Sequence, residues 1–431
     1  MKLYIDPGTG SMLFAILIGT IGALNYILKN GLLKLKFLLS GGKADASKDR
    51  IPFVIFSDDK RYWNIFEPVC RELDRRGMDV VYMTASPDDP ALDNEYEHIE
   101  GRFIGEGNKA FAKLNFLNAV IVLSTTPGLD VYQWKRSKDV GCYVHMLHGC
   151  NEVTGYRMFG LDYYDAVMLS GEYQERDIRA LEEMRHLEPK ELVTVGVPYM
   201  DEMAERLSAA ERGSAGHNEG REEAGAPDGE PSGKAAVRTV LLAPTWGPSS
   251  IFQKYGGKII DELVKTGYHI IIRPHPQSFS AEKALMDKLM KEYPPSKQVE
   301  WNRDNDNFDV LRRADIMISD FSGVVFDFSL VHNKPVIYAD TEFDKGPYDA
   351  WWLDTPFWTL TALPRIGQEL TADGLKGLKD MIDECLTNPK YEQGRHEVIR
   401  ETWEYKGEGA KRAADYLLEK YRELSVAEDV K

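Results

Sequence analysis

The stretch ADIMISDFSGVVFDFSLVHNKPVIYAD, residues 314 to 340, decides the fold. Its apolar runs Ile316 to Ser319 and Val336 to Ala339 predict two short strands, and Val324 to Val331 between them predicts a helix. Two strands joined by a helix form a βαβ unit, which is typical of a parallel sheet. We therefore expect an α/β protein.

The polar turn before that helix, Asp320 to Gly323, is predicted to bind substrate. Gly323 lets the backbone approach a ligand closely, and Ser322 offers a hydroxyl and an N–H at a helix start, where the dipole favours an anion. Asp327 follows one turn later, where its carboxylate can reach a ribose hydroxyl while a diphosphate sits above it. A capped helix without a ligand explains this stretch equally well.

The whole chain is globular, acidic and poor in cysteine. Its 431 residues allow two domains, and a hydrophobic fraction of 43% supports full cores. A net charge of -16 argues against a nucleic-acid partner, because phosphate backbones require clustered cations. The 4 cysteines include no C-x-x-C pair, so neither a disulfide framework nor a zinc site is indicated. We expect a reducing environment and no metal or cofactor.

The amino-terminal segment is predicted to anchor the protein in a membrane. Residues Pro7 to Leu28 carry no charge, and Met12 to Leu28 is almost continuously apolar, close to the ~20 residues that a spanning helix needs. Several lysines follow this segment, whereas only Lys2 precedes it, which places the main body in the cytoplasm. The expected location is the cell membrane, with a single pass and cytoplasmic catalytic domains. A buried core helix or a signal peptide is the alternative.

Residues 51 to 197 show short apolar strands alternating with helices, which is typical of a parallel, doubly wound sheet. Ligands bind such sheets outside the carboxyl ends of the strands. His148 directly follows the apolar run Tyr143 to Leu147, so it is expected at such an end. A histidine there can take a proton from an acceptor hydroxyl near neutral pH. Simple packing explains His148 by position equally well.

A second alternating series begins at Val237, after a segment that is predicted to be a disordered linker or insertion. Ser208 to Ala236 contains no large apolar residue, so it cannot bury enough surface to offset its ordering entropy. In the second series, the strand His269 to Ile272 leads into Arg273 and His275. Charge-assisted bonds from both side chains to a diphosphate would neutralise the leaving group. A purely structural turn is the alternative.

Five motifs in this order resemble those of the CDP-glycerol glycerophosphotransferase family. They are MLHG (146 to 149), VGVPYMD (195 to 201), LAPTW (242 to 246), RPHP (273 to 276) and SDFSGVVFDFSL (319 to 330). Enzymes of that family build the polyol-phosphate chains of teichoic acids and related bacterial polymers. Their fold is similar to that of the GT-B glycosyltransferases, with two facing Rossmann-like domains and the nucleotide bound mainly by the carboxyl-terminal one.

By this resemblance, His148 and His275 are expected to be catalytic. His148 matches the family's proposed base, and His275 matches its histidine on the diphosphate side. Ser322 and Gly323 match the phosphate-binding turn, and Asp327 matches the downstream carboxylate. Arg273 and Asp320 complete the predicted substrate-binding residues.

The resemblance implies a membrane-anchored, GT-B-like transferase of two domains. It would move glycerol phosphate from CDP-glycerol to a hydroxyl of a polymer or lipid-linked polyol-phosphate acceptor, and release CMP. The expected parts are an anchor and juxtamembrane segment (1–45), an acceptor-side domain (46–207), the linker (208–236) and a nucleotide-binding domain that includes the terminal helix (237–431).

Two alternatives to this function stay open. One is a nucleotide-sugar glycosyltransferase or UDP-sugar 2-epimerase on the same fold. The other is a catalytically inactive, membrane-bound scaffold of the same family. The second is credible because the chain reads Cys-Asn-Glu at 150 to 152, where the family shows a threonine and soon afterwards a lysine.

Overall fold

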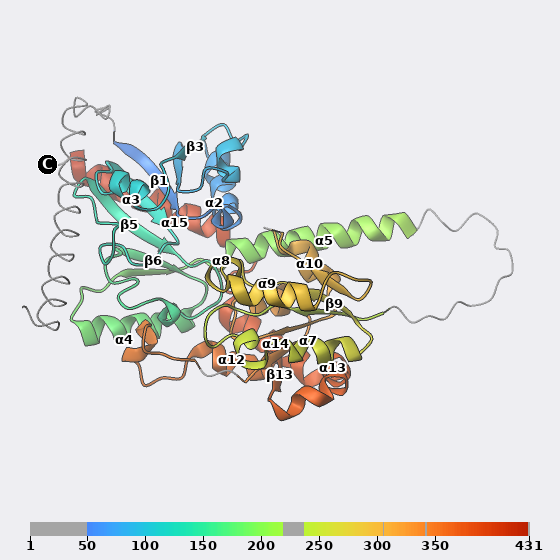
Figure 1. Cartoon of the computed structure of the whole chain (residues 1–431). Coiled ribbons are helices and arrows are strands. Elements are labelled where there is room, and N and C mark those ends of the chain that lie inside the picture. Colours follow the sequence, from blue (N-terminus) through green and yellow to red (C-terminus); the bar gives the residue numbers. More distant parts are fainter. Residues whose placement is uncertain (1–49, 219–236, 305, 341–342, 430–431) are drawn as a thin grey trace, which may run out of the picture. The chain divides into compact units, whose positions relative to one another are not determined.

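The structure, a computed structural model, contains two parallel β-sheets covered by helices (Figure 1). It describes residues 50–218, 237–304, 306–340 and 343–429. The anchor predicted for Met12 to Leu28 lies outside these residues. In the part of the chain that the structure describes, no helix is long and apolar enough to cross a membrane.

The first sheet has seven parallel strands in the order β3-β2-β1-β4-β5-β6-β7. The strands are β1 (Ile51–Ser57), β2 (Val80–Thr84), β3 (Ile99–Phe103), β4 (Ala119–Ser124), β5 (Val140–Met146), β6 (Ala166–Leu169) and β7 (Glu191–Thr194). The order reverses between β1 and β4, which makes this a doubly wound sheet with a switch point there. The predicted fold is confirmed for this half. The edge strand β3, IEGRF, was not predicted because its sequence has no apolar run.

Both faces of the first sheet are buried because successive side chains of a strand point to opposite sides. Phe53 and Ile55 of β1 belong to one core, with helix α2 (Trp63–Arg75), whereas Val54 and Phe56 belong to the other. The second core includes residues from α3 (Asn108–Leu114) and α4 (Glu175–Arg185). This explains the near-continuous apolar character of β1 in the sequence.

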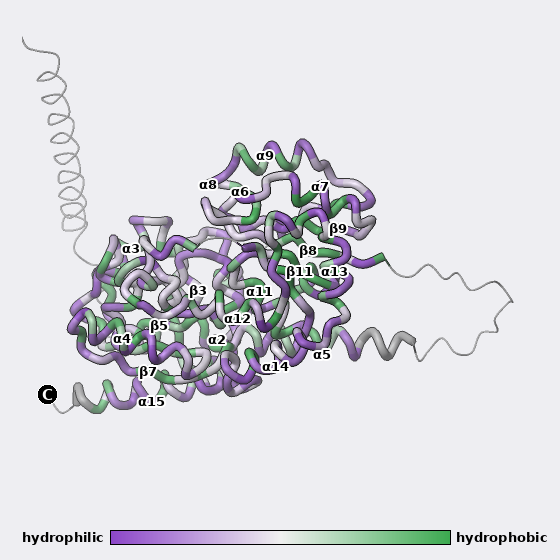
Figure 2. The backbone as a smooth tube through the Cα atoms, turned by 90° about the horizontal axis from the view of Figure 1, so that it is seen from below, coloured by the Kyte–Doolittle hydropathy of each residue, from purple (hydrophilic) through white to green (hydrophobic). Residues whose placement is uncertain are grey.

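The second sheet has six parallel strands in the order β10-β9-β8-β11-β12-β13, the same winding as the first. The strands are β8 (Thr239–Leu242), β9 (His269–Ile272), β10 (Val299–Trp301), β11 (Ile316–Ser319), β12 (Val336–Ala339) and β13 (Gly367–Leu370). Figure 2 shows the strongly apolar tube of β8 and β11 in the interior. The order reverses between these two strands, so their carboxyl ends border the second switch point.

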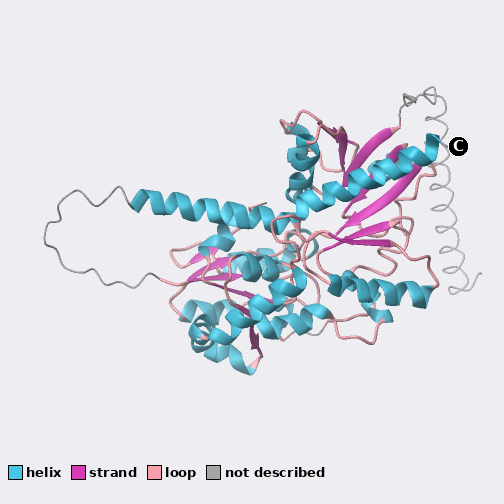
Figure 3. Ribbon diagram, turned by 180° about the vertical axis from the view of Figure 1, so that it is seen from behind, coloured by secondary structure: helices cyan, strands magenta, loops and turns pink. Residues whose placement is uncertain are grey.

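Helices cover both faces of the second sheet (Figure 3). Those that contribute to the core on one face are α6 (Ile251–Tyr255), α7 (Lys258–Lys265), α9 (Lys283–Glu292) and α13 (Leu378–Thr387). Those that contribute to the other are α5 (Pro198–Asn218), α10 (Phe308–Arg313), α12 (Trp358–Ile366) and α14 (Pro389–Thr402). The short helix α8 (Ser278–Ala281) directly precedes α9.

The βαβ unit predicted for residues 314 to 340 is confirmed with its strand bounds. Its helix starts with one α-helical turn, α11 (Val324–Phe326), and continues as a π-helical turn, η6 (Asp327–Val331). Such π-helical turns are rare and are frequent at functional sites. The irregularity begins at Asp327, the residue predicted to bind ribose.

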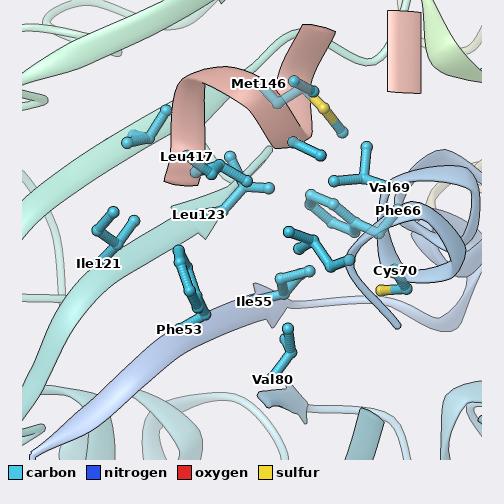
Figure 4. Close-up of a cluster of buried hydrophobic side chains, with 14 of the residues drawn as sticks. Phe53, Ile55, Phe66, Val69, Cys70, Val80, Ile121, Leu123, Met146 and Leu417 are labelled. Carbon is cyan, nitrogen blue, oxygen red and sulfur yellow. The ribbon is translucent and has the colours of Figure 1, made fainter. Parts of the chain in front are cut away.

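The C-terminal helix α15 (Gly409–Asp429) packs on the first sheet, although its sequence position assigned it to the second domain. Figure 4 shows Leu417 among side chains of β1, β4 and α2. Leu417 is 1% exposed, and full burial of a leucine side chain stabilises the fold by about 1.5–3 kcal/mol. Only the three-dimensional structure shows that α15 packs with the first sheet.

Helix α5 also differs from the expected domain bounds. It continues through Ser208, where the linker was predicted to begin, and ends at Asn218. Alanine and glutamate in this stretch have high helix propensity, and the packed part of the helix supplies a nucleus that the stretch alone lacks. Met200 and Met203 of α5 lie in a core of the second sheet. The remaining linker residues, 219 to 236, lie outside the described residues.

Candidate active site

A cleft of about 470 Å³ lies between the carboxyl ends of the two sheets. It contains five of the seven predicted site residues: His148, His275, Ser322, Gly323 and Asp327. The other lining residues come from both halves as well, and are Leu147, Gly149, Asn151, Glu152, Gly155, Tyr156, Thr245, Trp246, Phe321, Val324, Phe343, Tyr348 and Phe357. Parallel winding places each strand's outgoing loop at the same edge, so these residues converge although they are far apart in sequence.

His148 lies just beyond β5 and is half-buried beside aromatic rings. Its Nδ1 is 3.0 Å from the Thr125 hydroxyl, which follows β4. The ring centroid of Tyr62 is 5.6 Å from that of His148. Burial lowers the pKa of His148 to about 4, and the nearby positive charge of Arg61 adds to this effect. The imidazole is therefore neutral at pH 7, which is the form that can accept a proton.

His275 faces the cleft from the end of β9, and its tautomer follows from its contacts. The backbone N–H of Gln277 donates to His275 Nδ1 at 3.1 Å, so in the neutral ring the hydrogen is on Nε2. Burial, with the charges of Arg61 and Arg273, lowers the pKa of His275 to about 4. A neutral His275 can thus donate one hydrogen bond from Nε2 to an anionic oxygen.

The turn at Ser322 and Gly323 begins the helical run of α11 and η6. The Ser322 carbonyl accepts from Val325 N at 3.1 Å, and the Gly323 carbonyl accepts from Phe326 N at 3.0 Å. The first N–H groups of a helix have no acceptor within the helix and point out of its amino-terminal end. The Ser322 N–H donates to the Asp320 carboxylate, so the N–H groups that follow Ser322 are the ones suited to bind a phosphate oxygen.

Asp327 lies one turn further along and is half-buried at the cleft. Burial raises the pKa of Asp327 to about 7, while a hydrogen bond from Asn307 opposes the rise. Tyr199 holds that amide, because its hydroxyl donates to Asn307 Oδ1 at 2.9 Å. Near neutral pH, Asp327 can therefore exist as a carboxyl or a carboxylate.

Asp320 and Arg273 do not line the cleft, in contrast to the prediction. Asp320 is fully buried, and its carboxylate accepts from the backbone N–H groups of Thr245 at 3.0 Å and Ile251 at 3.1 Å. It therefore fixes the loop after β8 to the turn after β11. The Arg273 guanidinium donates to Asn302, beyond the end of β10, and burial lowers its pKa. Both residues thus bond to neighbouring loops of the second sheet.

Arg61 was not predicted and lies where it acts on both histidines. It belongs to the 3-10 turn η1 (Lys60–Tyr62), directly after β1. Its Nε donates to Asp59 Oδ1 at 2.9 Å, and its charge lowers the pKa of both His148 and His275. The sequence signal was its place after the carboxyl end of β1, at the switch point.

Glu152 is a second residue that sequence reasoning did not select. It is 6% exposed, and its Oε2 accepts from the backbone N–H of Thr359 in α12 at 2.6 Å. Burial raises the pKa of Glu152 to about 7, whereas the bonds from Thr359 lower it. This carboxyl group joins the loop after His148 to the second half of the molecule.

Three stacked aromatic rings form one wall of the cleft. Phe343 stacks on Phe357 with centroids 4.3 Å apart and on Tyr348 with centroids 5.1 Å apart. The neighbouring Asp349 attaches this wall to the first half, because its carboxylate accepts from the N–H groups of Phe159 at 2.8 Å and Gly160 at 3.2 Å. Of the tryptophans in this loop, Trp351 is 65% exposed.

No cluster of His, Cys, Asp and Glu side chains among the described residues is arranged to hold a metal ion. The candidate site consists of two imidazoles, a helix start, a carboxyl group and an aromatic wall. This set can accept a proton, hold a phosphate and contact a base or ribose.

Comparisons with known proteins concern the sequence and the fold. The model of a family described as CDP-glycerol:poly(glycerophosphate) glycerophosphotransferase matches residues 161–350. The structure is similar to that of the wall teichoic acid polymerase TagF with CDPG, with a TM-score of 0.58 and 15% identity, over 92% of this chain and 98% of that one. No curated protein matches the sequence.

The fold is also similar to that of another group of enzymes. The UDP-GlcNAc 2-epimerase of Methanocaldococcus jannaschii has a TM-score of 0.51 and 12% identity, over 86% of this chain and all of that one (100%). The UDP-GlcNAc 2-epimerase of Neisseria meningitidis has a TM-score of 0.50 at the same identity and coverage. At these identities the likeness shows a shared GT-B-like architecture. The family match confirms the resemblance drawn from the motifs and the expectation of a glycerophosphotransferase-like enzyme.

Proposed function

Because residues 161–350 of this chain match the CDP-glycerol:poly(glycerophosphate) glycerophosphotransferase family, we propose that the protein transfers glycerol phosphate from CDP-glycerol to an acceptor hydroxyl and releases CMP. The acceptor is a polymer or a lipid-linked polyol phosphate, as in the synthesis of teichoic-acid-like polymers. The observation that carries the proposal is that His148, His275 and the Ser322 turn, from two different sheets, line one cleft.

In the proposed step, the acceptor oxygen attacks the phosphorus that bears glycerol. The bond from that phosphorus to the bridging oxygen breaks, CMP leaves with the electron pair, and the proton of the acceptor hydroxyl passes to His148. The Thr125 hydroxyl can accept from Nδ1–H of His148, and in that tautomer the Nε2 lone pair is available as the base. His275 Nε2–H and the N–H groups of the Ser322 turn stabilise the charge that develops on the diphosphate. Asp327 accepts from the ribose.

The remaining proposals concern location. We infer a single-pass anchor at Met12 to Leu28, because a lipid-linked acceptor is met at the membrane and this segment is apolar and uncharged. The catalytic part is then cytoplasmic, where a nucleotide-activated donor is available. Fractionating cells that produce the full chain and a variant lacking residues 1–45 tests this. Equal recovery of both in the membrane fraction would refute the anchor.

Donor identity is tested with the purified protein and an acceptor preparation. CMP release from CDP-glycerol, without UDP release from UDP-sugars, is the expected result. UDP release, or conversion of UDP-GlcNAc to its 2-epimer, would replace the proposal by the sugar-nucleotide alternative. The inactive scaffold would be indicated if His148→Ala left cellular polymer output unchanged while deletion of the gene abolished it.

A further inference from the structure

The Asn151 side chain extends from the loop after His148 to the turn at Ser322 and Gly323, which follows β11 of the second sheet. A Cβ placed on Gly323 would lie 2.7 Å from Asn151 Oδ1 and 3.3 Å from its Nδ2. A Cβ placed on Gly149 would lie 3.3 Å from the same Oδ1. The amide therefore lies between the two glycines, on the side where each has no side chain. A side chain at 323 would displace the amide from this place.

The backbone around Asn151 is held firmly. Its carbonyl accepts from Gln174 Nε2 at 2.7 Å, and the carbonyl of Cys150 accepts from the Tyr173 hydroxyl. Gln174 and Cys150 are buried, and the next residue, Glu152, is bonded to α12. With the backbone constrained on both sides, the amide reaches Gly323 by rotation about its own side-chain bonds, which requires little reorganisation.

We propose that the Asn151 carboxamide is a substrate-binding residue that contacts the phosphate held at Ser322 and Gly323. Rotation of the amide by 180° exchanges Oδ1 and Nδ2, so Nδ2 can donate to a phosphate oxygen. Because Asn151 belongs to the loop that carries His148, a phosphate bound by Asn151 is held at a fixed position relative to His148, the general base. This inference deepens the proposed function and rests on it for the identity of the donor.

Replacement of Asn151 by aspartate is the sharpest test, because it keeps the shape and places a negative charge beside the phosphate. Binding of CDP-glycerol, UDP and inorganic pyrophosphate is measured by calorimetry on the full-length protein. We expect Asn151→Ala to weaken the binding of every ligand that the wild type binds by about 10- to 100-fold, the loss of one hydrogen bond to a charged group, and Asn151→Asp to weaken it by more than about 100-fold. Asn118→Asp, at an exposed position, adds the same charge and should change nothing.

The contact with Gly323 supplies a second, independent variant. The methyl of Gly323→Ala would displace the Asn151 amide, so it should weaken binding in the wild type and have a smaller effect in Asn151→Ala. Wild-type affinity in Asn151→Asp, or full additivity of Gly323→Ala and Asn151→Ala, would overturn the inference. Binding of UDP but not CDP-glycerol by the wild type would refute the proposed donor. The effect of Asn151→Asp on UDP affinity would then test the role of Asn151. Binding of none of the three ligands would overturn both.

Discussion

Substituting Asp349 by alanine should destabilise the protein strongly, because it removes one side of a buried charge network. The Asp349 side chain is 2% exposed and pairs with Arg185, which is 5% exposed and also pairs with Asp162 at 2.6 Å. The same carboxylate accepts from the N–H groups of Phe159 and Gly160. Arg185 further lies over the ring of Phe159, with 4.9 Å from its guanidinium carbon to the ring centroid.

The magnitude follows from these contacts. Removal of one partner from a buried ion pair costs about 3–5 kcal/mol, since it leaves the other charge without compensation. Arg185 retains Asp162, which places the pair's cost at the lower end of this range. The two N–H groups lose a charged acceptor, which costs about 1.5 kcal/mol each if they stay dry. Because these terms overlap, we expect a total of about 3–5 kcal/mol for Asp349→Ala.

Urea unfolding at pH 7, followed by tryptophan fluorescence, measures this difference. Asp287→Ala is the matched control, because Asp287 also forms an ion pair, with Lys283, but its side chain is 62% exposed. Exposed pairs contribute about 0–1 kcal/mol, so this control should unfold almost like the wild type. A loss below 1 kcal/mol for Asp349→Ala would refute the reasoning. Donor affinity should also fall in this variant, because Asp349 attaches the aromatic wall at Tyr348 to the first half.

Three further predictions concern the cleft. His148→Ala should lower transfer about 10²- to 10⁴-fold in a CMP-release assay and leave donor affinity unchanged. Because burial lowers the pKa of His148 to about 4, the wild-type imidazole stays neutral above that pH. The kcat/KM of the wild type should therefore show no loss attributable to His148 between pH 5 and 6.5. Burial raises the pKa of Asp327 to about 7, so donor affinity should rise as pH increases through 7, and calorimetry on Asp327→Asn should show this dependence removed. Burial raises the pKa of Glu152 to about 7, above its unfolded value, so its contribution to stability is complete below about pH 4.5 and is lost as pH rises through 7. Glu152→Gln, which can still accept from Thr359, should therefore be more stable than the wild type at pH 8, by about 1–3 kcal/mol in urea unfolding, and an unchanged pH profile would contradict this.

Sequence patterns were enough to predict the elements whose formation depends on neighbouring residues in the chain. The bounds of β11 and β12 were predictable because a strand buried on both faces is a short continuous apolar run. Edge strand β3 was not predictable, because IEGRF is mostly polar and is a strand only through its pairing with β2. Propensity at such an edge is weak compared with pairing.

Some residues of the candidate site could likewise be predicted from the sequence, and others could not. His148, His275 and the Ser322 turn follow apolar strands directly, and the rule that parallel sheets bind ligands at carboxyl ends was enough to select them. Asp320 obeys the same rule, yet its carboxylate faces the loop after β8 and not the cleft. Sequence adjacency determines where a residue leaves a strand but not the direction of its side chain.

By itself, the sequence determined two series of parallel strands, the βαβ unit at 314 to 340, and a set of candidate site residues, namely a polar turn and two histidines that each follow a strand. These properties depend on local periodicity and on the residue types that follow a strand. Only the tertiary structure decided that α15 returns to the first sheet, that Arg61 acts on both histidines, and that Asn151 reaches Gly323. Such contacts join residues more than eighty positions apart, and their free energy depends on how distant parts of the folded chain fit together, which no local pattern encodes.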